Sequence, residues 1–203
     1  MSRGATARLF VAVDAPRAVR EELAAWARGV ATGWGVRLAE GARQPLRLLE
    51  LDSMHLTLCF LGNRPVEEVE AIAAALSACA AHVGELSAGA PLWLPPRRPR
   101  ALAVEIHDAG GGLARMHEAL TGEISRASSW EPERRRFRAH ITVARMRETA
   151  VRRPRPRGEA PRLPATPQMR FTPESVALYR SWLSPAGATY EALAACALVP
   201  SER

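Results

Sequence analysis

The stretches MHLTLCFLG (residues 54–62) and AHITVARM (residues 139–146) nearly repeat one another. Each places a histidine, an aliphatic residue, a threonine and a second aliphatic residue in a row. Alternation of polar and apolar residues is typical of a β-strand that buries one face. The sequence therefore predicts two similar strands, one in each half of the chain, with histidine and threonine opposite the core.

Side chains two positions apart share a face of a strand. The first strand is then expected to carry these residues on its polar face: His55, Thr57 and Cys59. Its core side is expected to carry these apolar residues: Leu56, Leu58 and Phe60. The second strand is expected to place these residues on its polar face: Arg138, His140 and Thr142. Ile141 and Val143 then face the core, and Arg145 has the opposite parity from His140 unless a bulge intervenes.

The chain has 203 residues, of which 47% are hydrophobic, enough for one core or for two small lobes that share one. Its net charge is +7, and all 28 of its Lys and Arg residues are arginine. A codon preference can account for the absence of lysine. Arginine nevertheless matches phosphate oxygens with its planar fork, so phosphorylated partners are expected to be attracted.

Three cysteines, Cys59, Cys79 and Cys196, lack the CxxC spacing of a zinc site or a redox motif. Their odd number also argues against a disulfide framework, so we expect a reducing compartment. The first residues carry too short an apolar run for a signal peptide, and no stretch approaches ~20 uninterrupted apolar residues. We therefore expect a cytoplasmic protein without a membrane-spanning segment.

Strands are expected to outnumber helices. The expected strands are 8–13, 46–51, 55–62, 85–96, 100–106, 136–145 and a closing hairpin of 174–184 with 188–198. The first strand of the repeat is expected to end at Gly62. Helices are expected over 17–30, over 65–82, and from the glycines at 110–112 through Ile124. Residues 147–172 are rich in proline and arginine and are expected to form a mobile surface segment.

This order predicts an α+β fold in a single domain, residues 1–203. It consists of two pseudo-symmetric lobes of mainly antiparallel sheet with outer helices, and the site lies in a cleft between them. The two polar faces would then bring two imidazoles and two hydroxyls together. One imidazole can accept a proton while the other donates one, and the hydroxyls can bind anionic oxygens. This set suits displacement at a phosphate diester. Neither motif has a second ligand at metal spacing, so no metal or cofactor is expected.

Five segments together resemble the 2H phosphoesterases, and among them the RNA 2′,3′-cyclic phosphodiesterases, also called 2′-5′ RNA ligases. These segments are RLFVAVDAP, HLTLCFLG, PRALAVEI, FRAHITVAR and the closing VALYRSWLSPAGATYEALAACAL, and they cover almost the whole chain. The resemblance implies that His55 is the general acid and His140 the general base, with Thr57 and Thr142 binding the phosphate. The implied reaction opens a 2′,3′-cyclic phosphate on RNA to a 2′-phosphomonoester, or joins it to a 5′-hydroxyl as a 2′-5′ linkage.

The chain departs from the family at Cys59, which stands where relatives often carry a charged or polar residue. Cys59 is expected to be a small filler, with a reactive thiol as the alternative. The proline-rich segment 147–172 also differs from relatives, which often have a helix there. Two other functions stay open: a binding module for nucleotides or RNA ends without turnover, and a phosphodiesterase for small cyclic nucleotides or 2′-5′ oligonucleotides. The expected partner is RNA with a cyclic phosphate end or a small cyclic nucleotide, and the expected state is a monomer.

The remaining candidates are expected to have structural or surface roles. His82, His107 and His117 lie outside the motifs. The arginines at 97–100, 134–136 and 152–157 are expected to be solvated, with an RNA-tracking surface as the alternative. Trp93 and Trp130 are expected in the core, with base stacking as the alternative.

Overall fold

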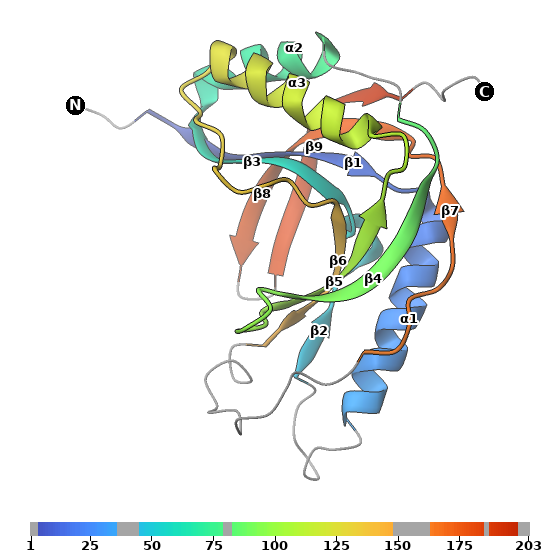
Figure 1. Ribbon diagram of the computed structural model, residues 1–203. Coiled ribbons are helices and arrows are strands. Elements are labelled where there is room, and N and C mark those ends of the chain that lie inside the picture. Colours follow the sequence, from blue (N-terminus) through green and yellow to red (C-terminus); the bar gives the residue numbers. More distant parts are fainter. Residues whose placement is uncertain (1–3, 36–44, 79–82, 148–162, 185–186, 199–203) are drawn as a thin grey trace.

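The computed structural model describes residues 4–35, 45–78, 83–147, 163–184 and 187–198 (Figure 1). Within these ranges the chain forms an α+β fold of nine strands and three α-helices. Each of the strand pairs is antiparallel. The predicted α+β class with a mainly antiparallel sheet is confirmed. No helix in the described ranges has the length and apolar character needed to cross a membrane.

The elements follow the predicted order, except that the short strand β7 lies in the segment 147–172, where no strand is predicted. The strands are β1 (Thr6–Asp14), β2 (Leu46–Leu48), β3 (Leu56–Pro65), β4 (Leu86–Leu94), β5 (Ala101–His107), β6 (His140–Met146), β7 (Arg170–Phe171), β8 (Ser175–Ser184) and β9 (Gly187–Ala197). The helices are α1 (Arg17–Gly35), α2 (Val69–Ala78) and α3 (Gly112–Ala127). Single turns of 3-10 helix lie at Leu51–Ser53 and Val66–Glu68.

The strands form one sheet in the order β7-β4-β5-β6-β3-β1-β8-β9, with β2 paired to β6. The sheet has two halves, and the two motif strands, β3 and β6, are the innermost strand of each. In the described structure these strands meet at one register pair, Leu56 with Ile141. The two halves that the sequence predicts are therefore present, and backbone pairing joins them into one continuous sheet.

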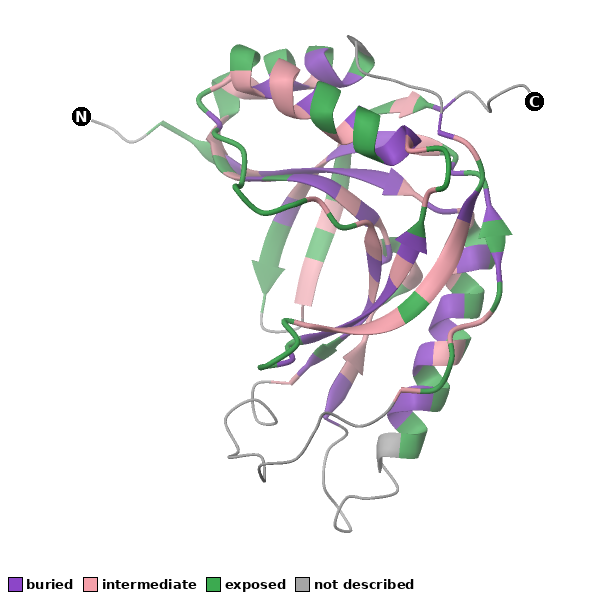
Figure 2. Ribbon diagram, in the orientation of Figure 1, coloured by how far each residue is buried: buried purple, intermediate pink, exposed green. Residues whose placement is uncertain are grey.

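The helices cover the two halves separately (Figure 1). Helices α2 and α3 pack on each other and on the half that contains β3, β8 and β9, whereas α1 packs near β2 and β6. Helix α3 buries these apolar side chains, all expected from its spacing: Leu113, Met116, Leu120 and Ile124. Helix α1 turns its buried face toward the strands and its exposed face to solvent (Figure 2). The core thus lies between the sheet and these helices.

Several predicted boundaries are wrong for local reasons. The strand expected over 136–145 begins only at His140, which pairs with Glu105, and residues 136–139 lead into it without strand structure. The strand expected over 46–51 stops at Leu48, before the 3-10 turn. The helix expected at 65–82 begins with a 3-10 turn that leaves Val66 42% exposed, and residues 79–82, with Cys79 and His82, lie outside the described residues.

Gly62 does not end its strand as predicted. The β1–β3 register shifts between the pairs Leu9–Gly62 and Phe10–Phe60, and pairing then continues to Pro65. Gly62 has a φ of 68°, which a glycine adopts without a steric penalty from Cβ. A bulge therefore replaces the expected strand end.

The last part of the Pro/Arg-rich segment is anchored rather than mobile. Arg170 and Phe171 pair with the start of β4. The Trp26 indole of α1 donates a hydrogen bond to the Ala165 carbonyl at 2.9 Å, and the Thr166 hydroxyl donates to the Gly89 carbonyl. The expectation is thus wrong for residues 163–172, while 148–162 lie outside the described residues.

Candidate active site

The register between β3 and β6 brings the two motifs together. Leu56 and Ile141, the residues directly after the two histidines, are partners across these strands. Both are buried in the common core, at 2% and 0% exposure. The neighbouring His55, Thr57, His140 and Thr142 are all half-buried. Two stretches that are remote in sequence therefore form one polar surface above one core.

Each motif strand contains a bulge at the same position. On β3, Thr57 pairs with Ala12 and Cys59 with Val11, so Leu58 is an extra residue. On β6, Thr142 pairs with Ala103 and Ala144 with Leu102, so Val143 is an extra residue. A bulge of one residue reverses the alternation of side chains beyond it. The two motifs thus share a local backbone irregularity as well as residue types.

The bulge on β3 overturns two predictions based on strict alternation. Cys59 does not lie on the polar face: it is 2% exposed in the core, and its sulfur lies 3.9 Å from the Thr121 hydroxyl of α3. Phe60 does not point into the core: it is 40% exposed, with the Arg8 guanidinium 4.9 Å from its ring centroid. Cys59 is therefore a core residue beneath the site.

The bulge on β6 changes the position of Arg145 in the same way. Ala144 becomes fully buried and Arg145 is exposed, on the side that carries His140 and Thr142. The charge of Arg145 contributes to lowering the pKa of His55, so the guanidinium lies near that ring. Strict alternation gives Arg145 the opposite parity from His140, and only the register of the sheet reveals the bulge that changes this.

Aromatic rings surround His55. Phe10 of β1 stacks on the imidazole with centroids 4.7 Å apart, and Tyr190 of β9 meets it edge-on at 5.1 Å. Tyr179 of β8 lies at 5.9 Å. Burial among these rings is the main cause that lowers the pKa of His55 to about 4, followed by the charges of Arg145 and His140. His55 is therefore neutral near pH 7 in the unliganded protein.

The Asp14 carboxylate holds the Tyr179 ring in place by hydrogen bonds. The Tyr179 hydroxyl donates to both oxygens of Asp14, at 2.9 and 2.8 Å, and the Ser175 hydroxyl donates to the same carboxylate at 3.0 Å. Burial and the Asp14 carboxylate raise the pKa of Tyr179, so its phenol stays protonated. Because Tyr179 also stacks on Phe10 at 5.2 Å, this network supports the ring that stacks on His55.

The backbone just before β6 orients the His140 ring. Its Nδ1 lies 2.7 Å from the Arg138 carbonyl oxygen. A carbonyl oxygen only accepts hydrogen bonds, so Nδ1 carries the proton and Nε2 holds the lone pair in the neutral ring. This arrangement leaves Nε2 as the atom that can accept a proton from a reactant.

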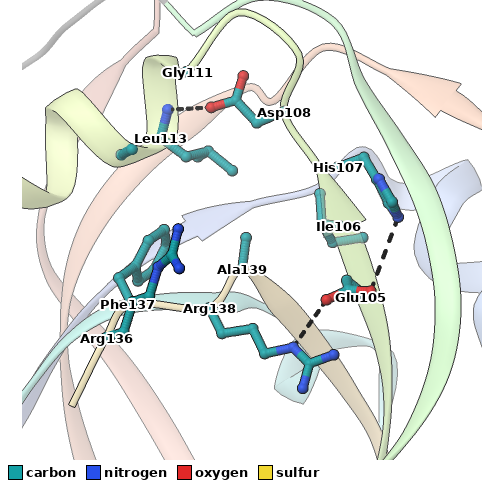
Figure 3. Close-up of a pocket in the computed structure, with 11 residues that line it drawn as sticks. Glu105, Ile106, His107, Asp108, Gly111, Leu113, Arg136, Phe137, Arg138 and Ala139 are labelled. Carbon is teal, nitrogen blue, oxygen red and sulfur yellow. Dashed lines mark hydrogen bonds and ion pairs between the residues drawn. The ribbon is translucent and has the colours of Figure 1, made fainter.

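Two cavities flank the motifs. One, of about 300 Å³, is called here the arginine cavity and is lined by these polar residues among others: Arg47, Glu50, Ser53, Arg145, Thr189 and Tyr190. The other, of about 610 Å³, is called the Glu105 cavity and lies beside the segment that leads into His140 (Figure 3). There Arg138 and His107 both point toward Glu105, at 2.8 and 3.9 Å (Figure 3). Arg138, which sequence placed on the face of His140, is therefore engaged with a carboxylate.

Those of the other candidates that the structure describes lie in the core or on the surface. His117 stacks on Phe137 with centroids 4.5 Å apart, and burial lowers its pKa. Trp130 is 7% exposed and donates to the Phe60 carbonyl at 3.2 Å, and Trp93 packs against the core. The described arginines at 97–100 and 134–136 are exposed, and 152–157 lie outside the described residues. Among the described residues, no group of three or more His, Cys, Asp or Glu side chains is placed to hold a metal ion.

Known proteins resemble this chain in sequence and in fold. The sequence matches no protein-family model. It is 28% identical over 154 residues to the RNA 2′,3′-cyclic phosphodiesterase of Escherichia coli (strain K12), covering 73% of this chain and 77% of that protein.

Two solved structures show the same fold. A protein of Thermus thermophilus superposes with a TM-score of 0.72 at 26% identity, covering 94% of this chain and 97% of that one. Escherichia coli LigT complexed with 3′-AMP superposes with a TM-score of 0.71 at 22% identity, covering 96% and 99%. In sequence and in fold the chain is therefore similar to RNA 2′,3′-cyclic phosphodiesterases, which agrees with the resemblance of its paired His-x-Thr motifs, on adjacent central strands, to the 2H phosphoesterases.

Proposed function

We propose that the protein is a metal-independent phosphodiesterase that opens 2′,3′-cyclic phosphate ends of RNA to 2′-phosphomonoesters. The observation that carries the proposal is the placement of His55 and His140 on adjacent strands, each followed two residues later by a threonine. Two imidazoles at one site can serve as base and acid in a single displacement. The similarity to the RNA 2′,3′-cyclic phosphodiesterase of Escherichia coli supports the same reaction class.

In the proposed reaction His140 is the base. Its Nε2 takes a proton from water, and the water oxygen bonds to phosphorus. The bond from phosphorus to the 3′ oxygen breaks, and His55 delivers a proton to that oxygen, which leaves a 3′-hydroxyl and a 2′-phosphate. The hydroxyls of Thr57 and Thr142 donate hydrogen bonds to the non-bridging oxygens as charge develops. A 5′-hydroxyl in place of water would yield a 2′-5′ linkage by the same steps.

Because the pKa of His55 is low, its proposed role as the acid requires that substrate binding raise this pKa. A ring with a pKa of about 4 is neutral in the free protein at pH 7, so it must gain a proton when substrate binds. The negative charge of the cyclic phosphate offsets the charge of Arg145 and favours the protonated ring. The alkaline limb of the kcat profile is therefore expected at higher pH than that of kcat/KM, because kcat reports the substrate complex.

The test is turnover, in EDTA, of a short RNA that ends in a 2′,3′-cyclic phosphate. The product should be the 2′-phosphomonoester, identified by mass spectrometry and by its resistance to a phosphatase specific for 3′-phosphates. His55→Asn and His140→Asn should each lower kcat/KM by about 10²–10⁴-fold. His107→Asn, which changes an exposed histidine at the Glu105 cavity, is the control. Equal turnover in all four proteins would reject the proposal.

A further inference from the structure

We infer that Glu105 is a positioning residue for His140 and that it acts through Arg138. The Glu105 carboxylate holds the Arg138 side chain, and the backbone carbonyl oxygen of Arg138 keeps the proton of His140 on Nδ1. This inference rests on the proposed role of His140 as the base. It specifies how that ring is kept ready to accept a proton.

Glu105 lies beside His140 on the polar face of the sheet. The two residues are direct register partners of β5 and β6. Directly opposite residues of an antiparallel pair point to the same face, with Cβ atoms about 4.5–5.5 Å apart. A carboxylate on a face that binds an anionic phosphate repels it unless the carboxylate is neutralised. Arg138 supplies the neutralising charge, so we expect Glu105 to serve the base rather than to contact the substrate.

Arg138 connects the carboxylate to the imidazole by its two ends. Its Nε donates to Glu105 Oε1 at 2.8 Å, and its carbonyl oxygen lies 2.7 Å from His140 Nδ1. The next peptide is held by the backbone, since the Ile106 amide donates to the Ala139 carbonyl at 3.0 Å. The peptide that carries the Arg138 carbonyl precedes the start of β6. The ion pair therefore ties this peptide to β5 through the arginine side chain (Figure 3).

The second neighbour of the Glu105 carboxylate is too distant to hold it. His107 Nε2 lies 3.9 Å from Glu105 Oε2, beyond hydrogen-bond distance. Arg138 is therefore the partner that sets the orientation of the carboxylate. The side chains of Arg138 and Glu105 are 51% and 27% exposed, and an ion pair this exposed contributes little to folding stability. Breaking the pair should accordingly leave the protein folded and alter the setting of His140.

The chemical consequence concerns the tautomer of His140. A neutral imidazole carries its proton on either Nδ1 or Nε2. Only the tautomer with the proton on Nδ1 leaves Nε2 free to take a proton from water. If the Arg138 carbonyl moves away, part of the protein holds the proton on Nε2 and cannot act as base. The loss of one such hydrogen bond corresponds to a decrease in kcat of about three- to tenfold.

The kinetic experiment measures kcat and KM for Glu105→Ala, Arg138→Ala and the variant with both changes. If these side chains acted on His140 only by their charges, removing the carboxylate and removing the guanidinium would change kcat in opposite directions. If they act through the shared carbonyl, each single change lowers kcat by about three- to tenfold with little change in KM, and the double change lowers it no further. Opposite effects, or losses that multiply in the double variant, would overturn the inference.

The spectroscopic experiment observes the tautomer directly. Nitrogen-15 NMR of the His140 ring at alkaline pH, where imidazoles are neutral, distinguishes a proton on Nδ1 from one on Nε2. The signals are assigned by their absence in His140→Asn. The native protein should show Nδ1–H, and Glu105→Ala should show a mixture of the two tautomers. The matched control is Glu123→Gln, which breaks the exposed ion pair with Arg126 on α3 and should keep the native tautomer. The native tautomer in Glu105→Ala would overturn the inference.

Failure of the proposed function can be told apart from failure of the inference. If the native protein does not hydrolyse RNA that ends in a 2′,3′-cyclic phosphate, the proposed function is rejected. The NMR comparison then decides alone whether Glu105 sets the tautomer of His140, because it needs no turnover. If the native protein is active and Glu105→Ala keeps both the native kcat and the native tautomer, the inference is overturned and the proposed function stands.

Discussion

Leu56 of β3 and Ile141 of β6 are paired across the line where the two halves of the sheet meet. Each is the residue directly after a motif histidine, and each is almost fully buried. The pair therefore joins the two halves and also sets the distance between the two imidazoles. This coupling of core packing to site geometry leads to the first prediction.

Ile141→Ala is expected to lower the free energy of unfolding by about 2–5 kcal/mol, since it leaves a cavity in the core. It should also lower kcat, because a shift of β6 against β3 moves one imidazole relative to the other. The matched control is Ile124→Ala on α3, which is also 0% exposed but lies away from the junction. Urea unfolding and turnover of both variants provide the measurements. An equal loss of kcat in the two variants would contradict the coupling.

Protonation of His55 is expected to lower the free energy of unfolding as the pH decreases. Its pKa is about 4 in the folded protein against 6.5 for the free side chain, so between these values the unfolded chain binds more protons. Stability should therefore be full above about pH 6.5 and decline toward pH 4, by up to about 3 kcal/mol.

His55→Asn removes this titration. Urea unfolding at intervals from pH 7 to pH 4 should show a shallower loss of stability in the variant than in the native protein. Other histidines and the carboxylates titrate in both proteins, so their contributions to the pH dependence of stability cancel in the comparison. Curves of equal slope would show that His55 is not buried as the structure places it.

Arg145→Gln is expected to raise the pKa of His55, because the guanidinium charge disfavours the imidazolium. NMR titration of the His55 ring protons measures the change directly. The variant should also bind inorganic phosphate more weakly, seen as weaker competitive inhibition. Arg28→Gln, with the same loss of charge on α1, should leave the His55 midpoint in place. An unchanged midpoint in Arg145→Gln would contradict the position that the β6 bulge gives this side chain.

Thr57 and Cys59 lie on either side of the bulge at Leu58 and should respond differently to truncation. Thr57→Val removes a hydroxyl from the site and should lower kcat/KM by about a hundredfold. Cys59→Ala changes a core contact with Thr121 and should cost about 1 kcal/mol of stability while turnover persists. Activity assays and urea unfolding separate the two effects. Loss of activity in Cys59→Ala would place its thiol in the chemistry.

Periodicity predicts the three helices, most of the strands and the fold class, but not the short strand β7. Helix α3 buries the four apolar residues that its spacing predicted, and the hairpin of β8 and β9 lies within a residue or two of its expected ends. These features depend on contacts between residues close in sequence, which the order of apolar and polar side chains encodes directly. The boundaries at 48, 62 and 140 differ from those predicted, because pairing between remote segments, including the bulge beside Gly62, decides where a strand continues.

The doubled His-x-Thr pattern by itself determined which four side chains would share a polar surface and which family they resemble. Only the tertiary structure decided what surrounds them. The bulges after Thr57 and Thr142 bury Cys59 and expose Arg145, and strands from distant parts of the chain bring Phe10, Tyr179 and Tyr190 to His55. The physical reason is that a bulge and a strand register are set by pairing between remote segments, whereas alternation is a property of one segment alone.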